Sequence, residues 1–155
     1  MARMNNTLWN RYKYKLNVLI ILLPFYFIYQ SLTPEPLESW PAKKIASFEV
    51  TPMPDNFDPP YFHDDHYTKD FSLTFTQGKV SNIRQAYLNI GKEPIALSTL
   101  EAGNEGILHG SQHGQEAHAI SPKVLKATDK VWLTIADWQG HHVITSWDLP
   151  QALLP

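Results

Sequence analysis

The residues most able to do chemistry in this sequence are its histidines. All seven lie between positions 63 and 142 of the 155-residue chain: His63, His66, His109, His113, His118, His141 and His142. Imidazole is a common ligand of zinc and copper, and the chain has no cysteine that could supply a thiolate instead. A metal site made of histidines is therefore the first chemistry to consider.

Two histidine pairs have spacing that would suit an ion. His63 and His66 enclose two aspartates, so two nitrogens and two carboxylates lie within four residues. His109 and His113 are four residues apart and are flanked by glycines that would let the backbone fold around an ion. We therefore name His63, His66, His109 and His113 as the candidate ligands of copper or zinc.

An ordinary structural role competes with the metal site. Histidine is a usual polar residue of loops, and the sequence has no established ligand spacing such as HExxH. His141 and His142 are adjacent, and in a strand they would point to opposite faces. We expect no cofactor, and we keep a periplasmic copper- or zinc-binding domain as the alternative.

The sequence contains no recognisable catalytic constellation. Ser111 lies between two histidines but lacks the G-x-S-x-G elbow of a hydrolase, and phosphate-binding and dinucleotide fingerprints are absent. The pair Asp64 and Asp65 is typical of solvated loop acids. We predict no catalytic residues and a non-enzymatic protein.

Aromatic side chains offer a different function, which is binding of a partner protein. Trp132, Trp138 and Trp147 lie in and around the last β-rich segment of the chain and could form a strip for a partner. Packing in the core is the competing fate of such residues. The net charge of −2 argues against a partner nucleic acid, which would need a basic surface.

These residues would have to be positioned by a chain whose charge is strongly divided. Residues 1–15 carry four basic side chains and no acid, whereas the other 140 residues carry nine basic and fifteen acidic ones. The next segment, 16–34, has no formal charge. A helix over 16–32 would measure about 26 Å, slightly less than the ~30 Å hydrocarbon core of a bilayer.

The basic block and the apolar run predict a signal anchor. A cleaved signal peptide is the main alternative, but no small-x-small cleavage pattern follows the run. The positive-inside rule then puts residues 1–15 in the cytoplasm as a basic stub. The expectation is a single-pass protein of the cell inner membrane, with its C-terminal part periplasmic or otherwise extracytoplasmic.

The rest of the chain divides into a linker and a β domain. Residues 33–60 hold seven of the twelve prolines, which predicts an extended linker with a possible first strand at 45–50. Residues 61–155 are expected to form the β domain. Alternating apolar residues predict strands at 71–76, 95–100, 130–137 and 142–148. Residues 81–90 fit a helix or a strand, and strand is favoured by their neighbours. The four glycines of 102–122 predict a long loop.

The fold class expected from these elements is a single N-terminal transmembrane helix followed by a small all-β, antiparallel sandwich-like domain. The function expected is that of a membrane-anchored, non-enzymatic accessory protein. Its partners would be the lipid bilayer and another envelope or integral-membrane protein, which the outer domain would bind or stabilise.

Overall fold

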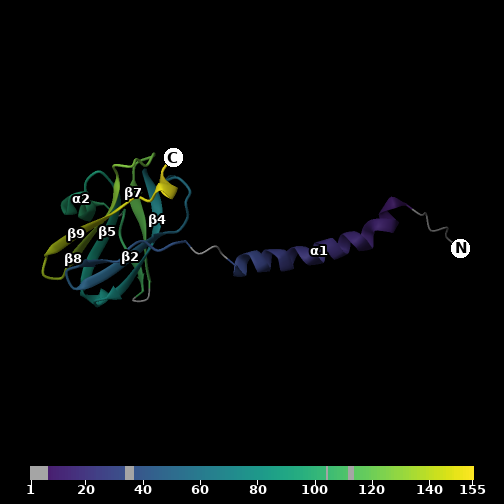
Figure 1. The fold of residues 1–155 in the computed structure, drawn as a ribbon, viewed down its shortest axis with the longest axis horizontal. Coiled ribbons are helices and arrows are strands. Elements are labelled where there is room, and N and C mark those ends of the chain that lie inside the picture. The colour runs from purple at the N-terminus through teal and green to yellow at the C-terminus, as the bar shows by residue number, and fades with distance from the viewer. Residues whose placement is uncertain (1–6, 34–36, 104, 112–113) are drawn as a thin grey trace. The chain divides into compact units, whose positions relative to one another are not determined.

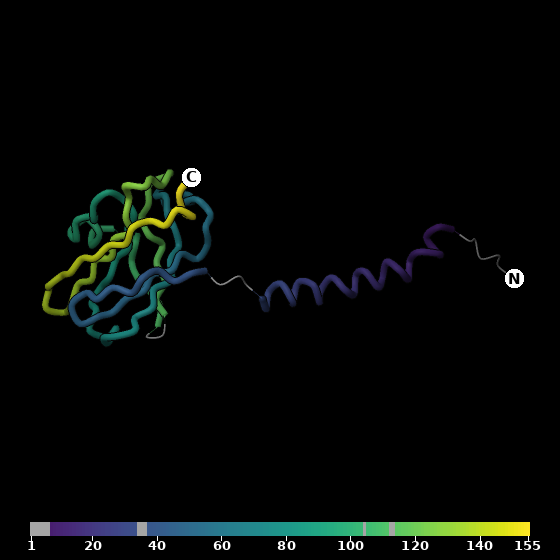
Figure 2. The backbone as a smooth tube through the Cα atoms, viewed as in Figure 1, coloured from purple at the N-terminus to yellow at the C-terminus, as the bar shows by residue number. Residues whose placement is uncertain are grey.

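A computed structural model describes residues 7–33, 37–103, 105–111 and 114–155 of the chain (Figure 1). The chain divides into two compact units, residues 1–36 and Leu37–Pro155. The first contains helix α1 (Leu8–Leu32), and the second contains the β domain. The tube in Figure 2 traces the strands of the second unit as they curve around its core.

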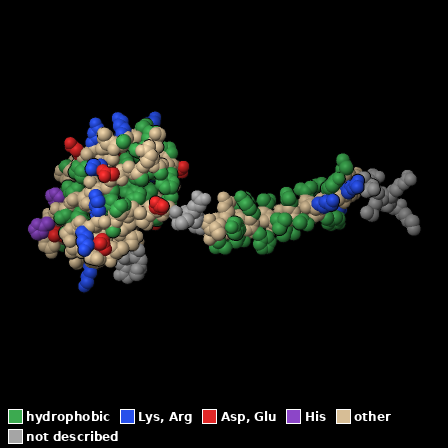
Figure 3. Space-filling model, viewed as in Figure 1, with side chains coloured by type: hydrophobic (Ala, Val, Ile, Leu, Met, Phe, Trp, Pro, Cys, Tyr) green, Lys and Arg blue, Asp and Glu red, His purple; other side chains and the backbone are tan. Residues whose placement is uncertain are grey.

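Helix α1 is long enough and apolar enough to cross a membrane. Its 25 residues measure about 37 Å at ~1.5 Å per residue, which exceeds the hydrocarbon thickness of a bilayer. It begins at Leu8, eight residues before the predicted start, so part of the basic stub is helical. None of its residues is buried, and apolar side chains cover its visible face while Lys and Arg gather near its N-terminal end (Figure 3). Water alone would not solvate such a surface well.

The β domain is built on one nine-stranded sheet among the described residues, with the main strand order β1-β2-β4-β7-β5-β8-β9. Its strands are β1 (Lys43–Ile45), β2 (Phe48–Pro54), β3 (Tyr61–His63), β4 (His66–Gln77), β5 (Ile83–Gly91), β6 (His109–Ser111), β7 (Gly114–Ser121), β8 (Lys130–Asp137) and β9 (His142–Asp148). The two short strands β3 and β6 pair with β4 and β7 outside this path. Short 3₁₀ turns at Val80–Asn82 and Gln151–Leu153 and helix α2 (Leu97–Ala102) complete the unit.

The sheet is mixed and nearly closed, so the expected antiparallel sandwich is corrected to a barrel-like fold. Strands β5 and β7 run parallel, whereas the other ladders are antiparallel. The outer strands β1 and β9 approach each other through side chains: Trp147 Nε1 donates to the carbonyl of Pro41 at 2.8 Å, and Lys43 Nζ donates to the carbonyl of Ser146. These contacts cover two sheet edges that would otherwise be exposed.

The proline-rich segment assigned to a linker contributes β1 and β2 to the domain. Pro52 and Pro54 lie in β2, but β1 pairs only with Phe48–Val50, so the prolines occupy a part of the strand with no ladder partner on the β1 side. A proline in a sheet is tolerated where its missing N–H is not needed. Residues 48–50 of β2 lie within the possible first strand predicted at 45–50, and β2 continues through the prolines to Pro54.

Two further expectations were wrong, and two were right. The long loop expected at 102–122 is interrupted by β6 (His109–Ser111) and β7 (Gly114–Ser121). Strand β7 escaped prediction because it buries small side chains, Ala117 and Ala119, that give little apolar signal. The strand expected at 95–100 is replaced by α2, whose Leu100 is buried. The strand favoured for 81–90 is confirmed by β5, and the hairpin of β8 and β9 is confirmed as well.

The core lies inside the curved sheet. It is formed by the alternate side chains that point inward from every major strand, and its fully buried members include Val50, Phe71, Leu73, Leu88, Ala119, Val131 and Leu133. Each large apolar side chain that is buried contributes about 1.5–3 kcal/mol. The opposite side chains of the same strands therefore form the outer face, where polar groups can gather.

A lysine is buried together with this core. Lys69 in β4 is 2% exposed, and its Nζ donates to the carbonyls of Asn56 (2.8 Å) and Asp58 (2.7 Å) and to Asn56 Oδ1. Burial lowers the pKa of this ammonium, and the nearby Asp58, Asp70 and Asp55 carboxylates offset part of that effect. Lys69 therefore ties the β2–β3 connection to the sheet with all three of its N–H donors.

Replacement of Lys69 should destabilise the domain. Lys69→Met keeps most of the buried stem but leaves the two carbonyls without their donor, which should lower the free energy of unfolding by about 1–3 kcal/mol. Urea unfolding of the full-length protein in detergent, followed by tryptophan fluorescence, measures this. The exposed Lys92 supplies a matched control, since Lys92→Met should unfold like the wild type. Equal unfolding midpoints for both variants would contradict the assigned role.

Candidate functional site

A cluster of histidines occupies the outer face of the sheet where β3, β4, β6 and β7 meet. In the β4–β7 ladder Asp70 lies directly opposite His118, and in the β3–β4 ladder Tyr61 lies opposite Thr68. Because alternate residues share a face, Tyr61 and His63 lie on the same side of the sheet as Asp70. Register alone therefore gathers these side chains on the face opposite the core.

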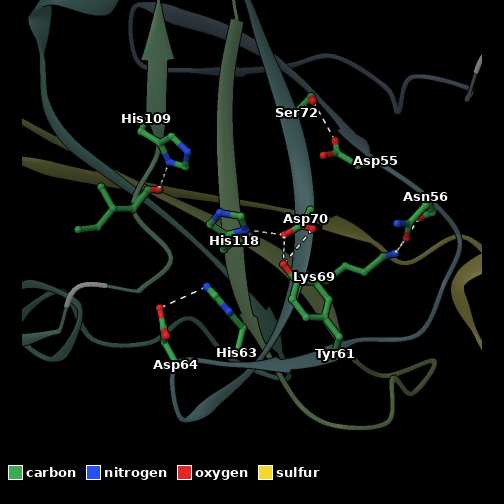
Figure 4. Close-up of polar contacts among 11 residues, drawn as sticks. Asp55, Asn56, Tyr61, His63, Asp64, Lys69, Asp70, Ser72, His109 and His118 are labelled. Carbon is green, nitrogen blue, oxygen red and sulfur yellow. Dashed lines mark hydrogen bonds and ion pairs between the residues drawn. The ribbon is translucent and has the colours of Figure 1, made fainter.

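The rings of three histidines lie in a row on this face. The ring centroids of His63 and His118 are 5.9 Å apart, and those of His109 and His118 are 5.7 Å apart. Figure 4 shows His118 between the other two, with Asp70 on its far side. The three histidines line a pocket of about 250 Å³ together with Asp64, Thr68, Glu105 and residues 106–107. We call these three residues the histidine row.

The tight turn between β3 and β4 positions the first member of the row. Asp64 and Asp65 both have positive φ, 45° and 66°, as a two-residue type I′ hairpin turn requires. Aspartate is one of the few residues that tolerates this conformation at modest cost. His63 and His66 therefore become a directly opposed pair across the turn.

Hydrogen bonds fix the orientation of two rings in the row. His118 Nδ1 is 2.6 Å from Asp70 Oδ1, and His109 Nδ1 is 3.4 Å from the carbonyl oxygen of Ile107. Carboxylate and carbonyl oxygens only accept, so in both rings the Nδ1 atom carries the proton. In the neutral imidazoles the Nε2 atoms of His109 and His118 are then the acceptors.

Asp70 is held from a second side by a tyrosine. The hydroxyl of Tyr61 donates to Asp70, with its oxygen 3.0 Å and 3.1 Å from the two carboxylate oxygens. The pKa of Tyr61 is raised, first by burial and then by the negative charges of Asp70 and Asp55, although a contact with Thr68 opposes the rise. A protonated phenol and a protonated Nδ1 thus both point at one carboxylate.

The four metal ligands named from the sequence are only partly brought together. His63 and His109 lie in the row, but His66 turns its Nδ1 toward the carbonyl of Asp64 (2.9 Å) and lies 3.9 Å from Glu105 Oε1. His113 lies outside the described residues. Among the residues described, no three histidine, aspartate or glutamate side chains already surround one point at metal-binding distance.

Sequence reasoning missed His118 and Asp70. The signal that could have found them is the alternation of Gln115, Ala117, Ala119 and Ser121, which are buried, with the exposed side chains between them. That pattern is a strand, and a strand places His118 on the face opposite the two alanines. His141 and His142 lie elsewhere, beside the β8–β9 turn.

The three tryptophans named as a partner-binding strip do not form one. Trp147 is buried, and it pairs with Val131 in the β8–β9 ladder, so neighbouring Trp132 faces the other side of the sheet. Trp132 is half-buried and donates its Nε1 to the carbonyl of Gly91 at 2.9 Å. Trp138 is 65% exposed at the turn and is the member of the three that solvent can reach freely.

Hydrogen bonds connect Trp138 and the turn around it to the backbone. Its Nε1 donates to the carbonyl of Ser81 at 3.0 Å, and Asp137 Oδ1 accepts from the backbone N–H groups of Gln139 (2.9 Å) and His141 (2.8 Å). Partial burial would raise the pKa of Asp137, but the hydrogen bonds from His141 and Gln139 outweigh it, and the pKa is lowered. A pocket of about 340 Å³ lies beside the ring and includes Phe48.

Comparison with protein families places this architecture in a known group. The model of the family described as "Uncharacterised conserved protein UCP029505" matches residues 8–150, which include both α1 and nearly all of the β domain. The chain belongs to this family. Searches of curated proteins and of solved structures found no significant match. The family model therefore covers both the apolar helix and the barrel-like domain. Its description names no activity.

The link between Tyr61 and Asp70 can be tested by titration. Asp70→Asn should lower the pKa of Tyr61 because the carboxylate charge near the phenol is removed, but the pKa should stay above its ordinary value since burial is the larger cause. Carbon-13 NMR of assigned tyrosine rings between pH 9 and 12 measures both values. Tyr67 serves as an internal reference, and an unchanged Tyr61 titration would contradict the contact.

Proposed function

We propose that this chain is a single-pass protein of the cell inner membrane whose extracytoplasmic β domain binds another membrane or envelope protein, without catalysing a reaction itself. The support comes from two features that belong to one family architecture: an apolar helix without buried residues, and a domain with a fixed, exposed tryptophan. The first feature argues for the anchor, and the second argues for a partner.

The orientation follows from charge. Arg11, Lys13 and Lys15 lie in the first turns of α1, and the apolar stretch after them carries no formal charge until residue 35. Basic residues next to a membrane helix favour the cytoplasmic side. The N-terminus is then cytoplasmic and the β domain extracytoplasmic.

The observation that carries the binding role is Trp138. A tryptophan that is two-thirds exposed leaves a large apolar area in water, and the hydrogen bond of its Nε1 to the Ser81 carbonyl favours one orientation of the ring. Binding anchors of this kind lose little side-chain entropy on association and often dominate an interface. The pocket beside it offers apolar atoms of Phe48, Ile135 and Val143 to a partner.

The membrane topology gives the first test. Protease added to intact spheroplasts should remove the β domain, because that domain lies outside the cytoplasm in this proposal. A cytoplasmic marker protein should survive the same treatment, and alkaline carbonate should leave the anchor fragment in the membrane. A β domain that is digested only after lysis would show the opposite orientation, and extraction by carbonate would argue against the anchor.

The partner surface gives the second test. A photo-crosslinking amino acid at position 138, in the full-length protein and in intact membranes, should form an adduct with an integral-membrane or envelope protein. The matched control is position 62, where Phe62 is an aromatic residue of similar exposure on β3. The proposal predicts an adduct at 138 and none at 62. An excess of protein without the crosslinker should reduce the adduct at 138 if it is wild type, but much less if it carries Trp138→Ala. Equal labelling at both positions, or none at either, contradicts a specific surface at Trp138.

A further inference from the structure

The histidine row has the chemistry of a metal site that is distinct from the Trp138 surface. Its three imidazoles come from β3, β6 and β7, and the described lining of the pocket includes the carboxylates of Asp64 and Glu105 but no Lys or Arg. Negative charge without a competing cation raises the local concentration of metal ions. The site is therefore electrostatically suited to a divalent cation.

The protonation pattern presents nitrogen lone pairs to the pocket. Metal-binding histidines characteristically donate their other ring N–H to a carboxylate or a backbone carbonyl, which fixes the tautomer and makes the free nitrogen more basic. His118 makes this bond to Asp70 (2.6 Å), and His109 is oriented toward the carbonyl of Ile107 (3.4 Å). Both Nε2 atoms are then available as ligands. Histidines that serve only as polar surface residues do not require such partners.

The distance from His118 to each of the other two rings is close to the distance between two ligands of one ion. Two imidazoles on one tetrahedral zinc ion, with Zn–N bonds of about 2.1 Å, have ring centroids roughly 5 Å apart. The observed separations of 5.7 Å and 5.9 Å exceed this by less than about 1 Å. One shared ion also requires the outer rings of His63 and His109 to turn toward each other around His118, which its hydrogen bond to Asp70 holds in place. The side chain of His63 is 51% exposed, so its rotation meets little steric resistance.

We propose that His63, His109 and His118 bind one divalent transition-metal ion, Cu²⁺ or Zn²⁺, and that Asp70 is the positioning residue for His118. Three nitrogen ligands without a thiolate suit these two ions, and Cu²⁺ should bind more tightly than Zn²⁺ in the order that nitrogen and oxygen sites follow. The fourth position is left to a pocket carboxylate or to water. The inference stands apart from partner binding, and either can fail alone.

Metal titration of the full-length protein in detergent tests the proposal. After removal of metal with a chelator, equilibrium dialysis against CuSO₄ or ZnSO₄ should give one ion per chain. The triple variant His63→Asn/His109→Asn/His118→Asn should lose this ion, whereas the control variant His141→Asn/His142→Asn, changed outside the pocket, should keep it. Failure of the wild type to bind, equal binding by the triple variant, or loss in the control overturns the assignment.

The role of Asp70 has its own readout. Asp70→Asn should leave the stoichiometry at one ion but weaken binding by about 10- to 100-fold, the usual effect of removing a carboxylate behind a metal-binding histidine. Unfolding midpoints measured in chelator check that the variants fold. Should the triple variant fail to fold, nitrogen-15 NMR of the wild type decides: Zn²⁺ should shift the ring nitrogens of His63, His109 and His118 and leave those of His141 and His142 in place, and the reverse pattern refutes the site.

Discussion

The pairing register of β4 with β7 is the constraint on which the rest of the domain depends. The ladder runs from Tyr67 opposite Ser121 to Leu73 opposite Gln115, and it joins strands from distant parts of the chain. In this register Phe71 and Ala117 face the core, while Asp70 and His118 face outward. A slip of one residue in β7 would turn His118 inward and expose the alanines. Core burial therefore enforces the geometry of the outer face, and the histidine row needs no packing of its own.

The size of the inward side chains and the pairing of the strands explain how far the sequence could predict the fold. The β8–β9 hairpin was predicted because its inward residues, Val131, Leu133 and Ile135, are large, apolar and spaced two residues apart. Strand β7 has the same alternation of burial, but its inward residues are small, so its periodicity is nearly invisible in apolar content. The possible first strand predicted at 45–50 overlaps the start of β2, but the continuation of β2 through Pro52 and Pro54 was not predicted. Only the pairing partners reveal that the missing N–H groups of these prolines are not needed there.

The candidate site shows a similar division. Local spacing identified His63 through the His63-Asp64-Asp65-His66 turn, and that turn does place a histidine on the site. His118 and Asp70 are 48 residues apart, and nothing in either segment indicates the other. Closure of the sheet also depends on a contact between distant parts of the chain: Trp147 donates a hydrogen bond to Pro41, 106 residues away. Contacts of this kind depend on strand order, which a single sequence read by periodicity does not contain.

The two exposed features, the histidine row and Trp138, lie at different places on the β domain. The histidine row lies on strands β3, β6 and β7, whereas Trp138 lies at the β8–β9 turn. His118 donates a hydrogen bond to the Asp70 carboxylate, and Trp138 donates one to the backbone carbonyl of Ser81. Changes at either place can therefore alter binding while leaving the core intact. α1 has no buried residue, and its apolar stretch has no ionisable side chain of the kind that ion or proton paths use. The histidine row and Trp138 therefore put the exposed groups with binding chemistry described above on the β domain.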